Sequence, residues 1–354
     1  MNDLCTIAIA VWNKPDITRQ CLESVAAHTE YPHELLLIDN GSGRPTKKLL
    51  EDFCRGKTNC RIKRFDENAG YLKAANFALE TLDTSYICLL NNDTIVTDGW
   101  LSECIRILGS CGDIGIVSPT TNEISDHFRT AFLSGCTRAL KGKSVEVNSG
   151  LGSCFILKKE VVKKIGLFDP VYMSGYFEEV DYSFKAASFG FKSVMALGAY
   201  IEHLSNASFS VMPEERKRLW HENRSIFESR WGRSERILVF VKGDYGKDVL
   251  LKRREYLLDK CRHRAIVELY CKRDDEWARG VHFNIRHKKS PLYAGLILCF
   301  MIRMKKKAYD TVITDIRVPP FLLKLFGIDL KGFYDFAGLK ALDADADPLR
   351  GAVH

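Results

Sequence analysis

The stretch Tyr86–Val96, YICLLNNDTIV, decides the fold predicted for this chain. Its apolar part, Ile87–Leu90, is short and bounded by polar residues, which is typical of a strand covered on both faces in a parallel sheet. Asn91, Asn92 and Asp93 follow where that strand ends. Ligands of open α/β sheets bind at the carboxyl ends of strands, and oxygen-bearing side chains suit a hard divalent cation. A plain Asn/Asp turn that closes a strand is the alternative interpretation.

Strands and helices are predicted to alternate before this stretch. Apolar runs predict strands, and apolar residues at helical spacing predict helices. The predicted strands cover 5–12, 34–38 and 61–65, and the predicted helices 16–27 and 46–53. A loop that opens a further helix, ENAGYLKAANFALETL, leads into the central strand. This alternation predicts a βαβ sheet with a crevice of nucleotide size.

Length and charge predict two domains. A chain of 354 residues exceeds the usual size of one domain. From Gly232 onward there are 25 Lys and Arg against 16 Asp and Glu, whereas the rest of the chain has 27 against 29. We therefore expect a near-neutral domain over residues 1–232 and a basic domain over residues 233–354. The second is expected close to anionic partners or a membrane surface, and no nucleic-acid partner is expected.

The cysteines and apolar runs predict a cytoplasmic chain. The 12 cysteines show no metal-like or paired spacing. Several lie inside apolar runs, where a reduced thiol behaves as a small hydrophobe, namely Cys5, Cys88, Cys154 and Cys299. The N-terminus lacks the basic region of a signal peptide. The longest apolar run, Leu292–Ile302, is shorter than the roughly 20 residues of a membrane-spanning helix. Peripheral contact with the inner face of the plasma membrane remains compatible with this pattern.

A set of ordered stretches carries a family resemblance. They are AVWNK, LLLIDNGSG, ENAGYLKAANFAL, LLNNDT, GSCFILKKEVVKKIGLFD, YFEEVDYSFKAASFG, HLSNASF and HENRSIFESRWG. In this order and spacing, over about residues 4–232, they resemble the front half of family 2 glycosyltransferases with the GT-A fold, in the rhamnosyltransferase-like branch. The resemblance implies an α/β sheet of GT-A type. It also implies transfer of a sugar from a nucleotide-diphospho-sugar donor, with inversion at the anomeric carbon.

The resemblance assigns residues to the nucleotide. Asp39 matches the residue that accepts a hydrogen bond from the ring N–H of uracil or thymine, which suits a carboxylate because it only accepts. Ala10 and Asn13 border the same contact, and an ordinary Asp-Asn-Gly turn is the alternative.

Three further residues match the loop and helix that flank the nucleotide, namely Asn68, Gly70 and Asn76. Gly70 allows close backbone approach, and a helix start presents free N–H groups to phosphate. For Asn76, a buried structural amide is an equal alternative.

Metal binding is implied for the NND group and a later histidine. Asp93 is the candidate ligand for Mg²⁺ or Mn²⁺, with Asn91 and Asn92 beside it at the cofactor site. The family's motif is often Asp-x-Asp, so Asn91 is a weaker neutral ligand or a ribose contact. His203, in AYIEHLSNASF, matches the family's late metal-ligating histidine, although an isolated histidine is more often structural.

The candidate base lies in YFEEVDYSFKAASFG, which predicts an amphipathic helix. The apolar face is expected to hold Phe177, Val180, Phe184 and Ala187. The family carries Glu-Asp where this chain has Glu178-Glu179, and the second residue is the catalytic base, so Glu179 is the first candidate. Asp181 is the second, with a surface pair to Lys185 as its structural alternative. Three carboxylates on a solvated helix face are the alternative for the whole group.

The rear domain shows α/β alternation from Ile237 onward and weakly resembles one Rossmann-like half of a GT-B glycosyltransferase. Its run Leu292–Ile302, followed by RMKKK, fits either a buried helix or a membrane-surface segment.

The function expected is that of an inverting, metal-dependent glycosyltransferase. It would act on a glycan or lipid-linked acceptor in surface polysaccharide or glycolipid synthesis, with a UDP- or dTDP-sugar as donor. The alternative is a catalytically weak module of the same fold that binds nucleotide sugar or glycan. Asn91 and Glu179, which stand where the family usually has aspartate, keep that alternative open.

Overall fold

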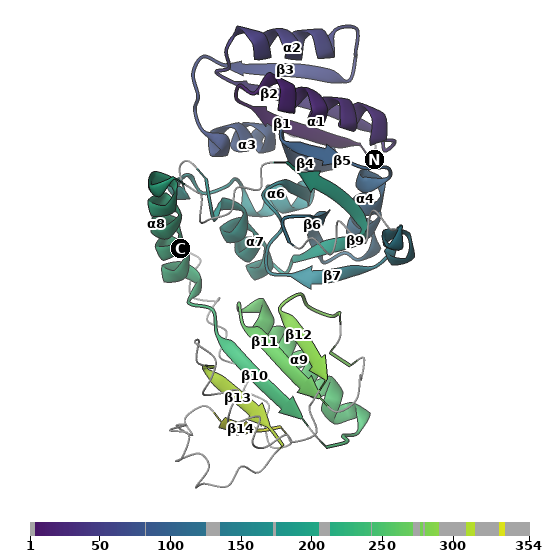
Figure 1. Cartoon of the computed structure of the whole chain (residues 1–354), viewed down its shortest axis with the longest axis vertical. Helices are drawn as coiled ribbons and strands as arrows, with labels where there is room; N and C mark the ends of the chain where they lie inside the picture. The colour runs from purple at the N-terminus through teal and green to yellow at the C-terminus, as the bar shows by residue number, and fades with distance from the viewer. Residues whose placement is uncertain are drawn as a thin grey trace. The chain divides into compact units, whose positions relative to one another are not determined.

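A computed structural model gives the fold of the chain (Figure 1). It describes residues 4–81, 83–124, 135–172, 175–204, 213–241, 243–271, 277–278, 280–289, 309–315 and 333–336. The chain divides into two compact units, Met1–Ser229 and Arg230–His354.

The first unit is built on one mixed sheet, which within the described residues has nine strands in the order β3-β2-β1-β4-β8-β6-β9-β5, with β7 also paired to β9. The strands are β1 Cys5–Val11, β2 His33–Asn40, β3 Cys60–Phe65, β4 Tyr86–Asn91, β5 Thr94–Val96, β6 Ile114–Thr121, β7 Ser144–Val147, β8 Cys154–Lys158 and β9 Lys192–His203. Neighbours among β3, β2, β1 and β4 are parallel. β8 is antiparallel to β4 and β6, and β9 is parallel to β6 but antiparallel to β5 and β7.

Helices cover both faces of this sheet (Figure 1). They are α1 Pro15–His28, α2 Arg44–Cys54, α3 Tyr71–Glu80, α4 Trp100–Ser110, α6 Lys159–Ile165, α7 Glu178–Ser188 and α8 Glu214–Trp231, with short 3-10 helices η1 Cys136–Leu140 and η2 Pro170–Tyr172. One core packs the sheet against residues of α1, α2 and α4, and the other against α3, α6 and α7.

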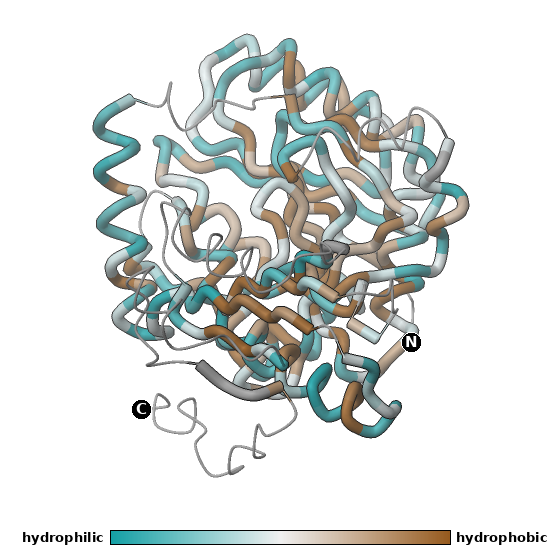
Figure 2. The backbone as a smooth tube through the Cα atoms, turned by 60° about the horizontal axis from the view of Figure 1, so that its bottom comes forward, coloured by the Kyte–Doolittle hydropathy of each residue, from teal (hydrophilic) through white to brown (hydrophobic). Residues whose placement is uncertain are grey.

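The central strand β4 lies between these two cores. Cys88 and Leu90 belong to the first core, and Ile87 and Leu89 belong to the second. All four are buried, so successive side chains point to opposite covered faces, as the apolar run predicts. Burial of each such leucine or isoleucine contributes about 1.5–3 kcal/mol relative to exposure. Figure 2, coloured by residue hydropathy, accordingly shows hydrophobic residues gathered towards the interior, whereas the residues of α8 are mostly hydrophilic.

One local prediction needs correction, and one open alternative is settled in part. β2 continues to Asn40, so Asp39 lies inside the strand and pairs in register with Arg64 of β3, not in a turn beyond it. The NND group forms a turn that returns immediately into β5, whose Thr94 is paired with His203 of β9. The long sheet therefore brings the end of β9 beside the end of β4.

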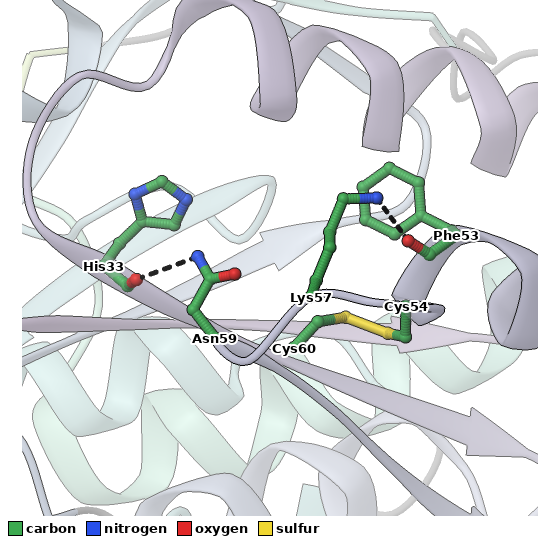
Figure 3. Close-up of a disulfide and its surroundings, with 6 residues drawn as sticks. All are labelled: His33, Phe53, Cys54, Lys57, Asn59 and Cys60. Atoms are coloured by element: carbon green, nitrogen blue, oxygen red, sulfur yellow. Dashed lines mark hydrogen bonds between the residues drawn. A yellow bond between two sulfur atoms is a disulfide. The ribbon is translucent and has the colours of Figure 1, made fainter.

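The prediction that the cysteines do not pair is wrong at one place (Figure 3). Cys54, the last residue of α2, forms a disulfide with Cys60, the first residue of β3, across a Cα–Cα distance of 5.4 Å. The short connection between α2 and β3 brings the two cysteines within bonding distance, although their spacing in the sequence gives no pairing pattern. Eight other described cysteines are free thiols, seven of them buried, which agrees with the prediction for Cys5, Cys88 and Cys154.

The second unit contains a parallel sheet over its described residues, in the order β12-β11-β10-β13-β14. Its elements are β10 Arg236–Val241, α9 Lys247–Arg262, β11 Ile266–Cys271, β12 Ile285–Lys289, β13 Thr311–Thr314 and β14 Phe333–Asp335. The predicted helix at Leu292–Ile302 lies outside the described residues. Among the described helices of the whole chain, none combines the length and apolar character needed to cross a membrane.

Candidate active site

A cavity of about 640 Å³ opens at the carboxyl ends of β1 and β4. It is lined by Ala10, Tyr71, Asn91, Asn92, Asp93, Glu123, Gly152, Ser153, Gly175, Tyr176, Glu178, Glu179, Glu215, Arg216 and Leu219. The structure thus brings together five predicted residues: Ala10, Asn91, Asn92, Asp93 and Glu179. Five of the lining side chains are carboxylic acids and one is a guanidinium, so the lining suits a cation and hydroxyl-bearing ligands.

His203 lies between two carboxyl groups at this edge of the sheet. Its Nε2 is 3.0 Å from Asp93 Oδ1, and its Nδ1 is 2.8 Å from Glu123 Oε1. Burial disfavours the charged imidazole, but the contacts with Asp93 and Glu123 outweigh burial and raise the pKa of His203 to about 10. Burial works against the charge of Glu123 in the same way, yet His203 and Ser153 lower its pKa below the ordinary value. The three side chains form one charged cluster, in which the imidazole lies between two carboxylates.

Asn122 fixes the backbone of His203. The His203 amide donates to Asn122 Oδ1 (2.8 Å), and Asn122 Nδ2 donates to the His203 carbonyl (3.0 Å). Ser153 donates to Glu123 Oε2 at 2.5 Å. The histidine is therefore held by hydrogen bonds at its backbone and at Nε2, and its Nδ1 lies within ion-pair distance of Glu123.

The residues around Asp93 fit a divalent cation only as part of a larger ligand set. Among the described residues, no group of three or more His, Cys, Asp or Glu side chains is arranged to hold a metal ion. Asp93 and His203 offer one carboxylate and one imidazole at 3.0 Å from each other. Mg²⁺ is commonly held by one or two protein carboxylates plus substrate phosphates, which is the arrangement that these residues fit.

Glu178 and Glu179 are the first residues of α7, and both line the cavity. Burial, together with the neighbouring Glu178 charge, raises the pKa of Glu179 to about 8. Burial likewise raises the pKa of Glu178, to about 6. A Cβ atom placed on Gly152 would lie 3.4 Å from Glu179 Oε1, so the Glu179 carboxyl group packs beside the Gly152 backbone. Glu179 is thus a carboxyl group placed in a cavity with a pKa suited to proton transfer near neutral pH.

The predicted surroundings of Asp181 are wrong. Its side chain is 5% exposed and accepts a hydrogen bond from the Tyr172 hydroxyl at 2.9 Å, so it lies in the protein and not on a solvated surface beside Lys185. The apolar face of α7 also differs from the prediction, because Ala187 is exposed and Tyr182 is buried. The helix starts at Glu178, and Phe177 before it has left-handed backbone geometry. Phe177 is therefore not part of the helix, and the buried face of α7 differs from the one predicted with Phe177 in it.

Asp39 lies at the carboxyl end of β2, away from the lining of the cavity. It is fully buried, and its Oδ1 accepts a hydrogen bond from the Ser42 amide at 2.9 Å. Its Oδ2 has no hydrogen-bond partner among the described atoms and lies 3.7 Å from Arg64 Nε. One carboxylate oxygen therefore keeps accepting capacity, which a buried group rarely does without a reason.

Asn13 links the ends of β1 and β2. Its amide donates to Ser42 Oγ, and its side-chain oxygen accepts from the Gly43 amide, both at 2.9 Å. Its backbone φ of 56° is in the left-handed region, which asparagine tolerates better than most residues.

Asn68, Gly70 and Asn76 line a second cavity, of about 650 Å³, on the α3 side. Asn40 orders this loop, because its Nδ2 donates to Asn68 Oδ1 (2.9 Å) and to the Gly70 carbonyl (3.2 Å). The Asn76 amide exchanges two 2.9 Å hydrogen bonds with the backbone of Phe168, which is the structural role that the sequence leaves open.

The sequence reasoning missed Tyr71, Asn122, Glu123 and Glu178 as site residues. The available signal was the position of TTNE at the end of the strand Ile114–Thr121, where a parallel neighbour delivers polar residues to the same edge.

Comparison with known proteins supports a glycosyltransferase. Residues 6–166 match the family model "Glycosyl transferase family 2". The glycosyltransferase AglE of Haloferax volcanii is 22% identical over 200 residues, which cover 54% of this chain and 64% of that protein. The teichoic acid poly(glycerol phosphate) polymerase of Staphylococcus epidermidis is 33% identical over 94 residues, which cover 26% of this chain and 13% of that protein. The chain thus spans less than two thirds of these relatives.

A solved structure supports the fold. A mannosyltransferase from Pyrobaculum calidifontis, in complex with GDP-Man and Mn²⁺, superposes with a TM-score of 0.50 at 14% sequence identity. The match covers 63% of this chain and 64% of that one. The expected α/β fold of GT-A type is confirmed at this level for the part of the chain that superposes.

Proposed function

We propose that this chain is an inverting glycosyltransferase, which moves a sugar from a nucleotide-diphospho-sugar to a hydroxyl of a glycan or lipid-linked acceptor. One observation carries the proposal: Glu179 and the Asp93–His203 group line or border one cavity at the carboxyl ends of β1 and β4. A proton acceptor and a cation-binding group are the two parts that this reaction needs. The family match over residues 6–166 supports the same reaction class.

Donor recognition is assigned to the carboxyl ends of β1 and β2. The free acceptor capacity of Asp39 Oδ2 suits the ring N–H of uracil or thymine, which makes a UDP- or dTDP-sugar the expected donor. Ala10 and Asn91, at the ends of the adjacent strands β1 and β4, would border the ribose and diphosphate. The loop ordered by Asn40 at Asn68 and Gly70 would cover the other side of the nucleotide.

Mg²⁺ or Mn²⁺ is the expected cofactor. Asp93 and His203 would hold it, the ion taking the place of the proton on His203 Nε2. The donor's phosphates would complete its ligands, because the described residues offer no third acidic, cysteine or histidine ligand in a suitable group. When bound, such an ion stabilises negative charge on the leaving diphosphate as a Lewis acid. Glu123 would keep the His203 ring oriented through Nδ1.

A residue of this chain is assigned to remove the proton of the acceptor hydroxyl. Glu179 accepts the proton of the acceptor hydroxyl while that oxygen forms a bond to the anomeric carbon. The bond from that carbon to the diphosphate oxygen breaks at the same time, and the nucleoside diphosphate leaves with the electron pair. Attack from the side opposite the leaving group inverts the anomeric centre. A pKa of about 8 makes Glu179 a competent proton acceptor in this step.

The biological setting follows from the relatives. The relative from Staphylococcus epidermidis is named for teichoic acid synthesis, which supports a surface polysaccharide or glycolipid as the expected product. We assign acceptor delivery to the basic second unit. Its five described strands have the order of a doubly wound sheet, which supports a GT-B-like half. Its excess of Lys and Arg supports peripheral contact with a membrane surface.

A donor-binding screen tests the proposal. Purified protein is heated with each of a panel of nucleotide sugars, with and without Mn²⁺, because a ligand of the native state raises the melting temperature. A metal-dependent rise with a UDP- or dTDP-sugar, followed by release of the nucleoside diphosphate, supports the enzyme. Binding without any release supports the alternative, a nucleotide-sugar-binding module, and no binding to any member overturns both.

A further inference from the structure

The two residues before the candidate base helix have an unusual backbone. Tyr176 and Phe177 have φ angles of 71° and 75°, and Phe177 occupies the N-cap position of α7. Aromatic residues rarely adopt left-handed geometry, which is unfavourable and persists only where the surrounding structure enforces it. The next two residues are Glu178 and Glu179, which line the cavity. Something must hold this turn in its unfavourable conformation.

Asn223 of α8 is placed to do so. Its Nδ2 donates to the carbonyl oxygens of Tyr172 (3.1 Å), Gly175 (2.8 Å) and Tyr176 (3.1 Å). The side chain is 3% exposed. Three converging carbonyls require the nitrogen, not the oxygen, of the amide to face them, so the orientation of this side chain is determined by its contacts. All three partners belong to the segment that leads directly into α7.

An aromatic cluster supports the same attachment. The Phe177 ring lies 5.5 Å from that of Trp220 and 5.4 Å from that of Phe227, and Phe227 also meets Phe184 of α7 at 5.3 Å. Asn223 and Phe227 are the buried residues of α8, one turn apart, while the rest of the helix is largely polar. The buried side of α8 is thus directed at the turn and helix that carry Glu179.

We propose that Asn223 is a positioning residue for the base. By binding the carbonyls of residues 172, 175 and 176, it holds Tyr176 and Phe177 in left-handed geometry and thereby places Glu179 in the cavity. This inference rests on the proposed function for its kinetic consequences, but its structural consequence stands separately. Loss of the amide donor lets the turn relax towards ordinary φ values. Glu179 then moves, and a displacement of about 1 Å at a reacting group can lower the rate by 10²-fold.

Four variants test the positioning role. Asn223→Ala removes the donor, and Asn223→Ser keeps a shorter hydroxyl donor in case the alanine variant folds poorly. Tyr176→Gly relieves the backbone strain at one of the two left-handed residues, because glycine adopts positive φ at little cost. The double variant Asn223→Ala/Tyr176→Gly asks whether relief of strain replaces the clamp. Tyr182→Phe is the matched control, since it deletes one buried hydrogen bond of α7, from the Tyr182 hydroxyl to the Gly166 carbonyl, without touching the turn.

Transfer kinetics and hydrogen exchange are measured for each variant. We expect kcat of Asn223→Ala to fall roughly 10²-fold with donor affinity unchanged, and that of Asn223→Ser to fall less. Amide exchange over residues 175–183 should accelerate in both variants. The control should keep its kcat and exchange in that turn. The fall in kcat caused by Asn223→Ala should be much smaller in the Tyr176→Gly background than in the wild type.

Three outcomes overturn the inference: unchanged kcat in Asn223→Ala, a parallel loss of donor affinity, or equal losses in the two backgrounds. If the wild type binds donors but transfers nothing, the proposed function fails, and hydrogen exchange alone decides whether Asn223 holds the turn. Accelerated exchange over residues 175–183 in Asn223→Ala then supports the clamp, and unchanged exchange overturns it.

Discussion

Replacing Glu179 by glutamine should remove most of the turnover. The side chain belongs to the first turn of α7 and packs beside Gly152, and an amide is nearly isosteric with the carboxyl group, so we expect Glu179→Gln to fold normally. An amide cannot accept the proton of the acceptor hydroxyl. General-base catalysis contributes about 10²–10⁴-fold, and kcat should fall by that factor while donor affinity stays the same.

The pH dependence gives the same prediction a second readout. The pKa of Glu179 is raised to about 8, first by burial and then by the charge of Glu178, and only the deprotonated form accepts a proton. The active fraction is therefore about one-tenth near pH 7 and about nine-tenths near pH 9, a rise of roughly tenfold. In wild type kcat/KM should increase over this interval, and in Glu179→Gln the increase should disappear.

Asp181→Asn is the matched control for this assay. Its Oδ1 accepts from the Tyr172 hydroxyl, and an amide oxygen can accept the same bond, so the variant should lose about 1 kcal/mol of stability and little activity. Release of nucleoside diphosphate is followed for both variants from pH 6 to pH 9. Greater loss in Asp181→Asn than in Glu179→Gln, or an intact pH rise in Glu179→Gln, refutes the assignment of the base.

Three further changes test other parts of the account. Asp93→Ala should abolish transfer and the Mn²⁺-dependent rise in melting temperature with donor, because it removes the charged ligand of the NND turn; near-normal activity in the presence of a chelator would contradict this. Asp39→Ala should raise the donor KM more than it lowers kcat, since the nucleobase of the donor lies far from the reacting carbon. Unchanged donor affinity in titration calorimetry would refute the contact between Asp39 and the nucleobase. Truncation after Gly232 leaves α8 complete and should preserve donor binding but weaken transfer to an anionic or lipid-linked acceptor; equal activity on that acceptor would argue against a delivery role for the second unit.

The sequence predicted the parts of the fold that depend on local pattern. The buried run Ile87–Leu90 became β4 because apolar residues on both faces require cover on both faces. Asp93 and Asn91 reached the cavity because polar residues at the end of such a strand lie at the ligand-binding edge. Glu179 reached it because the start of α7 lies at the same edge.

Features that depend on contacts between residues far apart in the chain could not be predicted from the sequence. Glu123 binds His203 across 80 positions of the chain, and the contact exists only because β6 and β9 are neighbours in the sheet. The environment of Asp181 was misread because the left-handed residues Tyr176 and Phe177 shift the start of α7, and their geometry depends on contacts from α8. The disulfide between Cys54 and Cys60 likewise follows from how a helix end meets a strand start.

The stereochemistry of the product tests the central claim most directly. The protein is incubated with an α-linked nucleotide sugar, Mn²⁺ and an acceptor, or with water as a slow acceptor, and the anomeric signals of the first product are followed by NMR. Single displacement with Glu179 as base predicts that the β anomer forms first, with loss of that signal in Glu179→Gln. First formation of the α anomer, or consumption of donor at the same rate in Glu179→Gln, contradicts the proposed mechanism.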